Sequence, residues 1–318
     1  MYKNARVGVV VPAYNEEKLI GRVLETMPDF VDVVIVVDDC SRDRTLEIAR
    51  GYQQRMGERL EVIRHETNQG VGGAIITGYK RAIALGLDVI AVMAGDAQMD
   101  PAELAQVIEP VVVGEADYVK GNRLFSGEAW ACMPRHRYFG NNVLSMMTKV
   151  ASGYWHVADA QSGYTAISLH ALKVLDLDRL SKRYQFENSI LIHLNVFNLP
   201  VVNVPVRPIY GIGEESGIRL WREIPAMSWY LIKGFFWRLK EKYVIRDFHP
   251  LLLFYASGLI LCPLGFLFGL YLILYRLLIG PAAATSALLA TFLTISGLQF
   301  LLFAMWFDME YGRNPRNR

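Results

Sequence analysis

A carboxylate and an amide stand two residues apart where an apolar run of the sequence ends. Asp96 and Gln98 follow the run 89–93, and Asp100-Pro101 comes directly after them. A short continuous apolar run is typical of a strand buried on both faces of a sheet, and Asp-Pro followed by Glu103 predicts a capped helix. We therefore expect Asp96 and Gln98 in a strand-to-helix turn, where their oxygens could bind Mg²⁺ or Mn²⁺ together with phosphate oxygens. A plain capped turn is the alternative interpretation.

Alternating strand and helix patterns surround this corner. Asn15 is a candidate cap for a helix that runs to about Met27, and a helix is expected to follow each of the first four strands. The expected strands are 7–11, 31–37, 60–65, 89–93 and 117–120. Such alternation with short links is typical of an α/β fold with a mainly parallel sheet and right-handed crossovers. The polar residues that end each strand should then meet at one ligand-binding edge.

Two other strand ends carry residues that could bind a nucleotide. Asp38 and Asp39 end the second strand, and acidic residues at this place can accept hydrogen bonds from a nucleobase imide or a ribose hydroxyl. Capping of the helix that follows is the alternative for both. The glycine-containing segment 70–73 resembles a phosphate cradle only loosely, and a tight turn is the better interpretation.

Four segments at the strand ends together resemble a known family. They are Val-Val-Pro-Ala-Tyr-Asn-Glu-Glu at 10–17, Val-Val-Asp-Asp-Cys-Ser-Arg-Asp at 36–43, Asn-Gln-Gly-Val-Gly at 68–72 and Asp-Ala-Gln-Met-Asp-Pro at 96–101. Over residues 5 to about 245 the chain resembles the family 2 glycosyltransferases of GT-A (Rossmann-like) fold, in particular polyprenyl-phosphate hexosyltransferases of the dolichyl-phosphate mannose or glucose synthase type. The resemblance implies a metal held by Asp96 and Gln98 and a nucleotide sugar held by Pro12, Tyr14, Glu16, Asp38, Asp39, Gly70, Asp96, Gln98 and Ser216.

The same resemblance extends to the acceptor side of the reaction. Gly-Asn-Arg at 121–123, the basic segment 135–141 and Asp-Ala-Gln-Ser-Gly-Tyr at 159–164 are similar to the family's motifs, and 207–218 corresponds to a loop near the diphosphate. The implied reaction is direct displacement with inversion at the anomeric carbon. Asp159 would orient the acceptor or a sugar hydroxyl. The implied catalytic set is Asp96, Asp159, Arg123, Arg135 and Arg137, and the implied acceptor-binding set is Arg123, Arg135, Arg137, Gln185 and Glu187.

Part of this chemistry follows from the residue types alone. A lipid monophosphate has a second pKa of about 6, so it is already mostly dianionic at neutral pH and needs no strong base. It needs positive charge to position it, and guanidinium groups match phosphate geometry. Arg135 and Arg137 could instead form a solvated basic helix face, and Glu187 could be a surface charge.

The metal corner departs from the family pattern at one position. Members usually carry Asp-x-Asp-x-Gln, and Ala94 replaces the first aspartate here. With one carboxylate fewer, the ion would depend more on nucleotide phosphates and water. We therefore expect the free protein to bind metal weakly.

The C-terminal third of the chain predicts attachment to a bilayer. Residues 251–275 and 282–307 are apolar stretches without a charged residue, and each is long enough to cross about 30 Å of hydrocarbon. Basic residues precede the first stretch and follow the second, so both ends and the catalytic domain are expected on the cytoplasmic face of the cell membrane. Residues 219–247 alternate aromatic and basic residues, which is typical of interfacial helices, although a helix packed on the soluble domain is the alternative.

These patterns give four expected parts. They are a GT-A domain at 1–218, amphipathic juxtamembrane helices at 219–247, two transmembrane helices within 248–310 (about 250–276 and 282–307) and a basic tail at 311–318. A net charge of +2 does not favour nucleic acid as the partner. Three scattered cysteines indicate no disulfide or zinc pattern, and no secretory signal is expected at the N-terminus.

Three rival functions share parts of this sequence pattern. A processive polysaccharide synthase would need more membrane spans and a Gln-x-x-Arg-Trp motif. A non-enzymatic scaffold would explain Ala94, but the acidic and basic set argues against it, and a membrane-anchored transferase with a water-soluble acceptor remains open. Ala94 and His249-Pro250 resemble family members that use UDP-sugars, and this resemblance favours UDP-glucose or UDP-N-acetylglucosamine as the donor, with GDP-mannose compatible. The sequence does not fix the oligomeric state, and a homo-oligomer is compatible with it.

Overall fold

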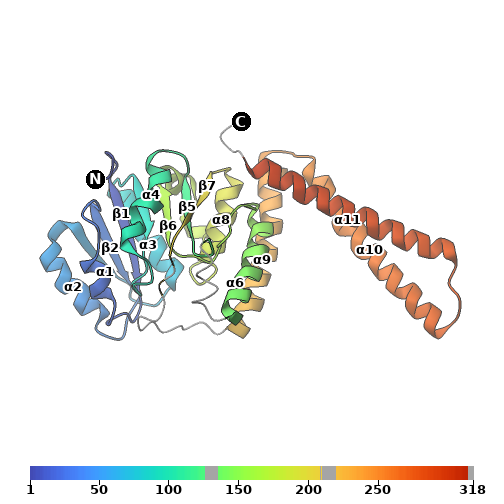
Figure 1. Ribbon diagram of the computed structural model, residues 1–318, viewed down its shortest axis with the longest axis horizontal. Helices are drawn as coiled ribbons and strands as arrows, with labels where there is room; N and C mark the ends of the chain where they lie inside the picture. Colours follow the sequence, from blue (N-terminus) through green and yellow to red (C-terminus); the bar gives the residue numbers. More distant parts are fainter. Residues whose placement is uncertain (126–134, 208, 210–219, 314–318) are drawn as a thin grey trace. The chain divides into compact units, whose positions relative to one another are not determined.

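The chain forms two compact units, Met1–Phe235 and Phe236–Arg318. The computed structural model describes residues 1–125, 135–207, 209 and 220–313, without the side chains of residues 136–138, 220–224 and 312–313. The first unit is an α/β domain (Figure 1). Its strands are β1 (Val7–Ala13), β2 (Val33–Asp38), β3 (Leu60–Arg64), β4 (Val89–Val92), β5 (Tyr118–Asn122), β6 (Thr165–Ser168) and β7 (Val201–Pro205).

The helices of this unit connect the strands. They are α1 (Ile20–Glu25), α2 (Thr45–Met56), α3 (Val71–Ala84), α4 (Leu104–Val112), α6 (Arg135–Ser152), α7 (Leu169–Val174), α8 (Phe186–Val196) and the start of α9 (Leu220–Lys240), with short 3-10 turns at Gly57–Arg59, Pro101–Glu103 and Leu177–Arg179. The expected mainly parallel sheet is confirmed, because its strand order is β3-β2-β1-β4-β6-β5-β7 and only β6 pairs antiparallel with its neighbours.

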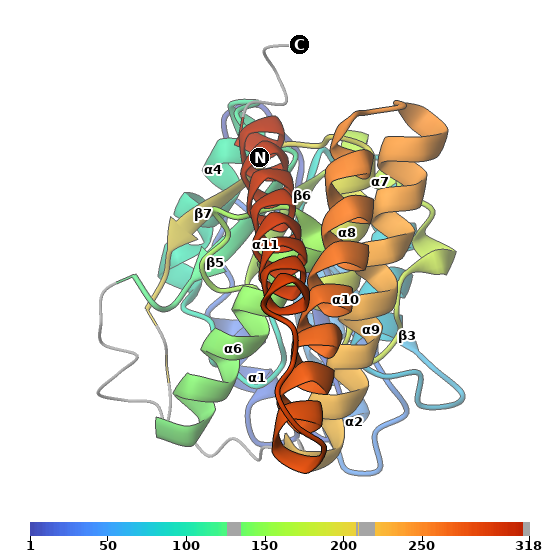
Figure 2. The same cartoon turned by 90° about the vertical axis from the view of Figure 1, so that its right-hand side faces the viewer.

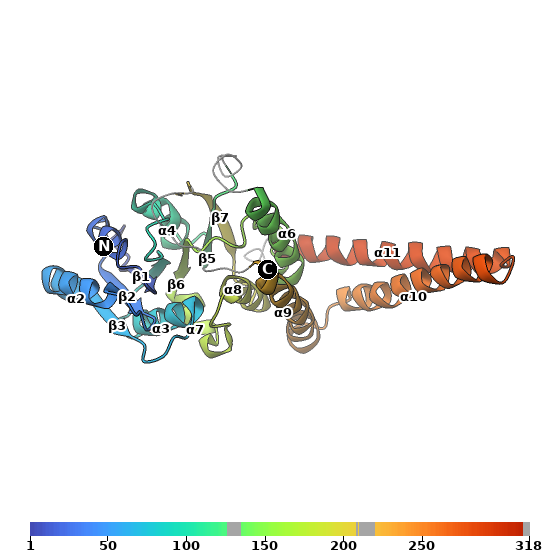
Figure 3. The ribbon, with the colours of Figure 1, turned by 90° about the horizontal axis from the view of Figure 1, so that it is seen from below.

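Two apolar cores lie on opposite faces of the sheet. Side chains alternate between the faces along each strand, so that Val10 and Ile35 pack with α3, α7 and α8, whereas Val9 and Val34 pack with α1, α2 and α4. Figure 3 shows α4 on one side of the strands and α3 with α7 on the other. Helices on both faces explain why the strands read as nearly continuous apolar runs.

The N-terminal helix is shorter than the sequence predicts. Asn15 does not cap it, because its backbone is left-handed with φ of 58° and α1 begins only at Ile20. The Asn15 side chain instead accepts a hydrogen bond of 2.9 Å from the backbone N–H of Arg42. Residues 14–17 therefore form a loop after β1 that is bonded to the loop after β2, and the polar residue that predicted a cap connects two strand ends.

The predicted helix cap after β4 is confirmed for Asp100 and Pro101 and is wrong for Glu103. Asp100 accepts a 2.9 Å hydrogen bond from the N–H of Ala102 and Pro101 follows it, as expected. The carboxylate of Glu103 does not complete a capping box. Its two oxygens accept the backbone N–H of Arg207 at 3.1 and 3.0 Å. Glu103 therefore attaches the segment after β7 to the start of α4.

The second unit contains two long apolar helices, α10 (Leu251–Leu278) and α11 (Ala284–Arg313). They pack against each other as a hairpin (Figures 1 and 2). Small residues permit this close approach, because a Cβ added to Gly258, Gly265 or Gly297 would lie within 2.6 Å of the other helix. Both helices are long and apolar enough to cross a membrane, and only 22% and 17% of their most apolar windows are buried within the chain. Core helices of a soluble domain would be mostly buried.

A buried charge pair joins the end of α9 to the end of α11 within this unit. Arg238 donates to both carboxylate oxygens of Asp308 at 2.9 and 2.8 Å, and both side chains are almost fully buried. Tyr243, in the π-helical segment Glu241–Arg246, donates a third hydrogen bond of 2.6 Å to the same carboxylate. A bidentate pair with an added donor satisfies a carboxylate that would be costly to bury alone.

Candidate active site

The reversed direction of β6 brings distant parts of the chain to one edge of the sheet. The parallel strands β1, β2, β4 and β5 end at this edge, and antiparallel β6 begins there, with Thr165 opposite Val92 and Lys120. The N–H of Gly121 donates to the carbonyl of Tyr164 at 2.8 Å. The segment 159–164 therefore lies beside the end of β5, as a shared site requires.

Asp38 and Asp39 have different surroundings although they are adjacent. Both are buried. In Asp38 one carboxylate oxygen accepts the N–H of Ser41 at 3.4 Å, and the other has no partner among the described residues. A buried polar atom without a partner is costly, so this oxygen fits a hydrogen-bond donor supplied by a ligand.

Asp39 is instead bonded to the protein itself. Its carboxylate accepts the backbone N–H groups of Gln69 and Gly70, both at 2.8 Å, and contacts the His65 ring at 2.7 Å. The other His65 nitrogen lies 2.9 Å from the hydroxyl of Thr77. Asp39 therefore fixes the 68–70 loop against β3 and α3. His65 was missed by the sequence analysis, although a histidine directly after a strand end was visible there.

Gly70 is required by its conformation and its neighbours. It has φ of 88°, and an added Cβ would lie 2.7 Å from the carbonyl oxygen of Lys182. The structure thus gives this glycine a role in packing at the start of α3. The predicted contact of Gly70 with a nucleotide sugar remains a prediction.

The first motif lies next to the β4 corner. The carbonyl of Pro12, in β1, accepts the N–H of Gly95 at 3.1 Å. Tyr14 is exposed in the loop that follows, and the backbone N–H of Glu16 donates to the Thr45 hydroxyl at 2.7 Å. The ends of β1, β2 and β4 are therefore connected by hydrogen bonds, and the three motifs form one surface.

The candidate metal corner is a tight turn. Asp96 accepts the N–H of Gln98 at 3.1 Å, and Ala97 between them has φ of 55°. Where the chain is described, no cluster of three or more His, Cys, Asp or Glu side chains could hold a metal. Asp96 and Gln98 provide one carboxylate and one amide oxygen, which is a partial ligand set for a hard divalent ion. An ion here would take its other ligands from a diphosphate and from water.

Arg123 and Asp159 form a close charge pair at the edge of the sheet. The guanidinium donates to both carboxylate oxygens at 2.7 and 3.1 Å, and the Arg123 backbone N–H also contacts the carboxylate at 3.3 Å. Asp159 is 1% exposed and Arg123 is 18% exposed. Asp159 therefore orients the arginine, and the Arg123 side chain keeps partial contact with solvent.

A second charge pair lies close to the first. Lys120 in β5 is completely buried and donates to the carboxylate of Glu187, which is 15% exposed. Burial lowers the pKa of the Lys120 ammonium, and the neighbouring Glu187 carboxylate opposes this shift. Glu187 is therefore not a surface charge, and its partner is a residue that the sequence analysis missed. The visible signal was a lysine that follows Tyr118 and Val119 inside an expected strand.

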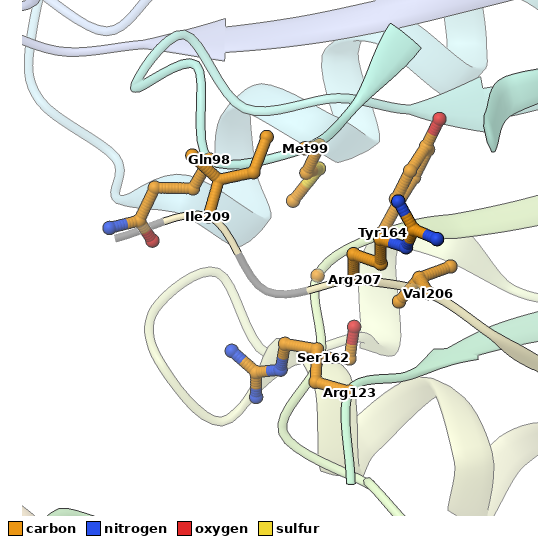
Figure 4. Close-up of a pocket in the computed structure, with 9 residues that line it drawn as sticks. Gln98, Met99, Arg123, Ser162, Tyr164, Val206, Arg207 and Ile209 are labelled. Carbon is orange, nitrogen blue, oxygen red and sulfur yellow. The ribbon is translucent and has the colours of Figure 1, made fainter. Parts of the chain in front are cut away.

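One pocket joins the metal corner to the charge pair. It is lined by Gln98 and Met99 after β4, by Arg123 after β5 and by Arg207 after β7, together with Ser162, Gly163, Tyr164, Val206 and Ile209. Figure 4 shows Gln98 and Met99 on one side of this pocket and Arg123 with Ser162 on the other. The lining of the pocket therefore includes one candidate metal ligand and two arginines, and arginine is a residue type that binds phosphate groups.

The remaining predicted residues lie on α6, next to α8, or outside the described chain. Arg135 is exposed at the first position of α6, and Arg137 follows in the same helix with a side chain outside the described set. Gln185 immediately precedes α8, and its side chain accepts a 3.4 Å hydrogen bond from Ser181. Ser216 lies outside the described residues.

An exposed apolar stripe on α6 was not anticipated. Phe139, Val143 and Met146 are 72%, 43% and 51% exposed, and their spacing places them on one side of the helix. Arg135 stands one turn before Phe139. The helix thus presents a cationic start followed by an apolar face, and the signal in the sequence was this spacing of three and four residues after a basic start.

The comparison with known families decides the classification. The model of glycosyl transferase family 2 matches residues 8–175, which is more than half of the chain. The chain belongs to glycosyl transferase family 2. The matched region contains Asp38, Asp96, Gln98, Arg123 and Asp159.

Relatives and solved structures agree with this family. The chain is 36% identical over 214 residues to a UDP-N-acetylglucosamine–dolichyl-phosphate N-acetylglucosaminyltransferase of Methanococcus voltae, covering 64% of this chain and 85% of the relative. It is 31% identical to an undecaprenyl-phosphate mannosyltransferase of Micrococcus luteus, covering 63% and 82%. A Mycobacterium tuberculosis glucosyl-3-phosphoglycerate synthase, solved with Mn²⁺ and UDP, has a TM-score of 0.54 at 20% identity, covering 74% of this chain and 80% of that one. That similarity supports the GT-A fold.

Proposed function

We propose that this family 2 member is a membrane-bound inverting glycosyltransferase that moves a hexose from a UDP-sugar to a polyprenyl or dolichyl phosphate. The observation that carries the proposal is the pocket in which Gln98 of the metal corner lies with Arg123 and Arg207. A transfer from a nucleoside diphosphate to a phosphate needs positive charge for two anionic groups in one place. Relatives whose names include dolichyl or undecaprenyl phosphate support this acceptor class.

The surroundings of Asp38 support a uracil base. One of its oxygens is close to the Ser41 N–H, and the other is buried without a partner in the described chain. Uracil offers a single imide N–H for this oxygen, whereas guanine offers two neighbouring donors that would use both carboxylate oxygens. N-acetylglucosamine is the first sugar to test, because the Methanococcus voltae relative is named for it.

The reaction needs no strong base. An oxygen of the lipid phosphate, already mostly dianionic at neutral pH, attacks the anomeric carbon while the bond to the UDP oxygen breaks and UDP leaves with the electron pair. Arg123 would hold the attacking phosphate, and Asp159 would fix the guanidinium in position through its two hydrogen bonds. Arg135, Arg137 and Arg207 would add positive charge. When bound, a divalent ion held by Asp96 and Gln98 would neutralise charge on the leaving diphosphate.

The chain would meet its acceptor at a bilayer. The two apolar helices would span the membrane, with the basic flanks and the catalytic unit on the cytoplasmic face. The exposed stripe on α6 and the aromatic residues of α9 fit an interface where an isoprenoid chain leaves the bilayer. Arg135, at the start of that stripe, would lie at headgroup depth.

The deciding experiment measures transfer into the lipid phase. The purified full-length chain is incubated with polyprenyl phosphate, Mg²⁺ or Mn²⁺, and labelled UDP-N-acetylglucosamine, UDP-glucose or GDP-mannose. Label from a UDP-sugar should enter the organic extract, and the Asp96→Ala variant should fail to move it. Transfer from GDP-mannose alone would overturn the base assignment. Transfer only to water-soluble acceptors would overturn the lipid acceptor.

A further inference from the structure

A glutamine lies on the exposed side of the second apolar helix. Gln299 is in α11, seven residues before Trp306, and its side chain is exposed. Within the described chain this side chain makes no hydrogen bond. By contrast, the hydroxyls of Thr291 and Thr294 in the same helix bond to carbonyls one turn earlier. Gln299 therefore brings an unsatisfied amide into an apolar segment.

The side of α11 that carries Gln299 is opposite the side that packs on α10. The contacts with α10 involve Thr294, Gly297 and Leu301, which are separated by steps of three and four residues. The exposed residues on the other side are also separated by steps of four and three, and they are Leu288, Phe292, Ile295, Gln299, Leu302 and Trp306. A seam with this spacing is the pattern by which helices pack along each other.

An amide at this position is costly in a bilayer. Gln299 lies about 10 Å along the helix from Trp306, at 1.5 Å per residue. Trp306 lies near the end of the apolar stretch 282–307, where a tryptophan is typical of the membrane interface. A glutamine side chain is too short to reach headgroups from that depth, unlike lysine or arginine. A polar group in hydrocarbon is usually paired with another polar group.

We propose that α11 pairs with α11 of a second copy of the chain along the seam from Leu288 to Trp306, with the two Gln299 amides hydrogen-bonded to each other. An amide carries both a donor and an acceptor, so it complements an identical amide across a two-fold axis. Two copies inserted in the same orientation form a parallel pair, which places identical positions of the seam opposite each other. This inference rests on the membrane location proposed above.

Energy transfer between labelled copies in liposomes tests the pairing. The full-length chain is labelled with donor or acceptor dye and diluted with lipid, and the lipid dilution at half dissociation is measured. Gln299→Leu should dissociate at about a tenfold lower dilution, because a hydrogen bond between membrane helices contributes about one decade in the association constant. Leu289→Ala, at an exposed position beside the seam, should leave the curve unchanged. Equal curves for the wild type and Gln299→Leu would overturn the pairing.

Cysteine cross-linking tests the geometry separately. In a background without the native cysteines, Ile295→Cys places a thiol on the seam one turn from Gln299, and Leu289→Cys places one beside it. Oxidation in liposomes should cross-link Ile295→Cys to dimers much faster than Leu289→Cys. Equal rates, or faster cross-linking of Leu289→Cys, would contradict the proposed face.

Failure of the pairing can be distinguished from failure of the proposed function. Gln299→Leu should keep wild-type sugar transfer per chain, because the residue is far along the chain from the catalytic motifs. Loss of the chain from membranes in alkaline carbonate would overturn the bilayer location and the pairing together. Absence of sugar transfer from chains that remain inserted and paired would overturn only the proposed activity.

Discussion

Breaking the buried ion pair of Lys120 and Glu187 should show how much this pair contributes to the stability of the first unit. Glu187→Gln removes the counter-charge from an ammonium that is completely buried, and removing one partner of a buried ion pair costs about 3–5 kcal/mol. For a unit of 235 residues, each kcal/mol lowers the melting temperature by about 2–4 °C. We therefore expect Glu187→Gln to melt about 6–20 °C below the wild type, measured by tryptophan fluorescence of the full chain in detergent.

Two companion variants separate lost charge from lost packing. Lys120→Met leaves Glu187, which is 15% exposed and keeps contact with water, so its loss should lie at the lower end of that range. The double variant Lys120→Met/Glu187→Gln leaves no buried charge, and it should recover most of the loss because neutral replacements of buried pairs are often nearly neutral. A double variant whose loss equals the sum of the two single losses would refute the reasoning.

The stability that Glu187→Gln loses should depend on pH, and the direction of this dependence follows from the pKa of Lys120. Burial already lowers the pKa of Lys120, and without Glu187 this pKa should fall further below the unfolded value of about 10.4. Between these two pKa values the unfolded chain binds a proton that the folded chain lacks, so stability rises with pH by up to about 1.4 kcal/mol per unit. The difference in melting temperature from the wild type should therefore narrow from pH 7 to pH 9. A constant or widening difference would contradict this account.

Three further predictions concern the substrate side of the site. Arg123→Lys loses the bidentate hydrogen bonds with Asp159. The value of kcat/KM should therefore fall by roughly 10- to 150-fold, which corresponds to a loss of about 1.5–3 kcal/mol. An unchanged circular dichroism spectrum is the control for folding. Asp38→Ala should raise the KM for the UDP-sugar by a similar factor and change the KM for lipid phosphate little; an unchanged donor KM would refute the base assignment. Removal of divalent ions should abolish transfer, and calorimetry should show weak binding of Mn²⁺ to the free protein that tightens with UDP; tight binding without UDP would count against the two-residue ligand set at Asp96 and Gln98.

The parallel part of the fold could be predicted because its signals are local. Each of the first four strands is a short apolar run, and β1 to β4 lie where the sequence places them, within a few residues. The direction of β6 could not be predicted, because four residues of β-type sequence contain no information about which neighbour they pair with. The misassigned cap at Asn15 has the same origin, since its side chain bonds to a loop 27 residues away.

The candidate site was predictable in its residue types and less so in its partners. The pairing of Arg123 with Asp159 depends on the reversed strand, so it follows only from the sheet topology. Asp38 and Asp39 have different surroundings because the loop between β3 and α3 donates backbone hydrogen bonds to the carboxylate of Asp39 and not to that of Asp38. Spacing along the chain identifies candidate residues, whereas their burial and hydrogen bonds require three-dimensional neighbours.

Arg123 and Asp159 lie at opposite ends of the long connection between β5 and β6. A break anywhere in residues 126–134 would leave the arginine on one fragment and the aspartate on the other, and the β4–β6, β5–β6 and β5–β7 ladders would join the two fragments. Co-expressed fragments could then recover sugar transfer only by reassembling those ladders. The domain therefore provides a natural position for a split enzyme, in which reconstitution of two polypeptides is reported by their own catalytic turnover.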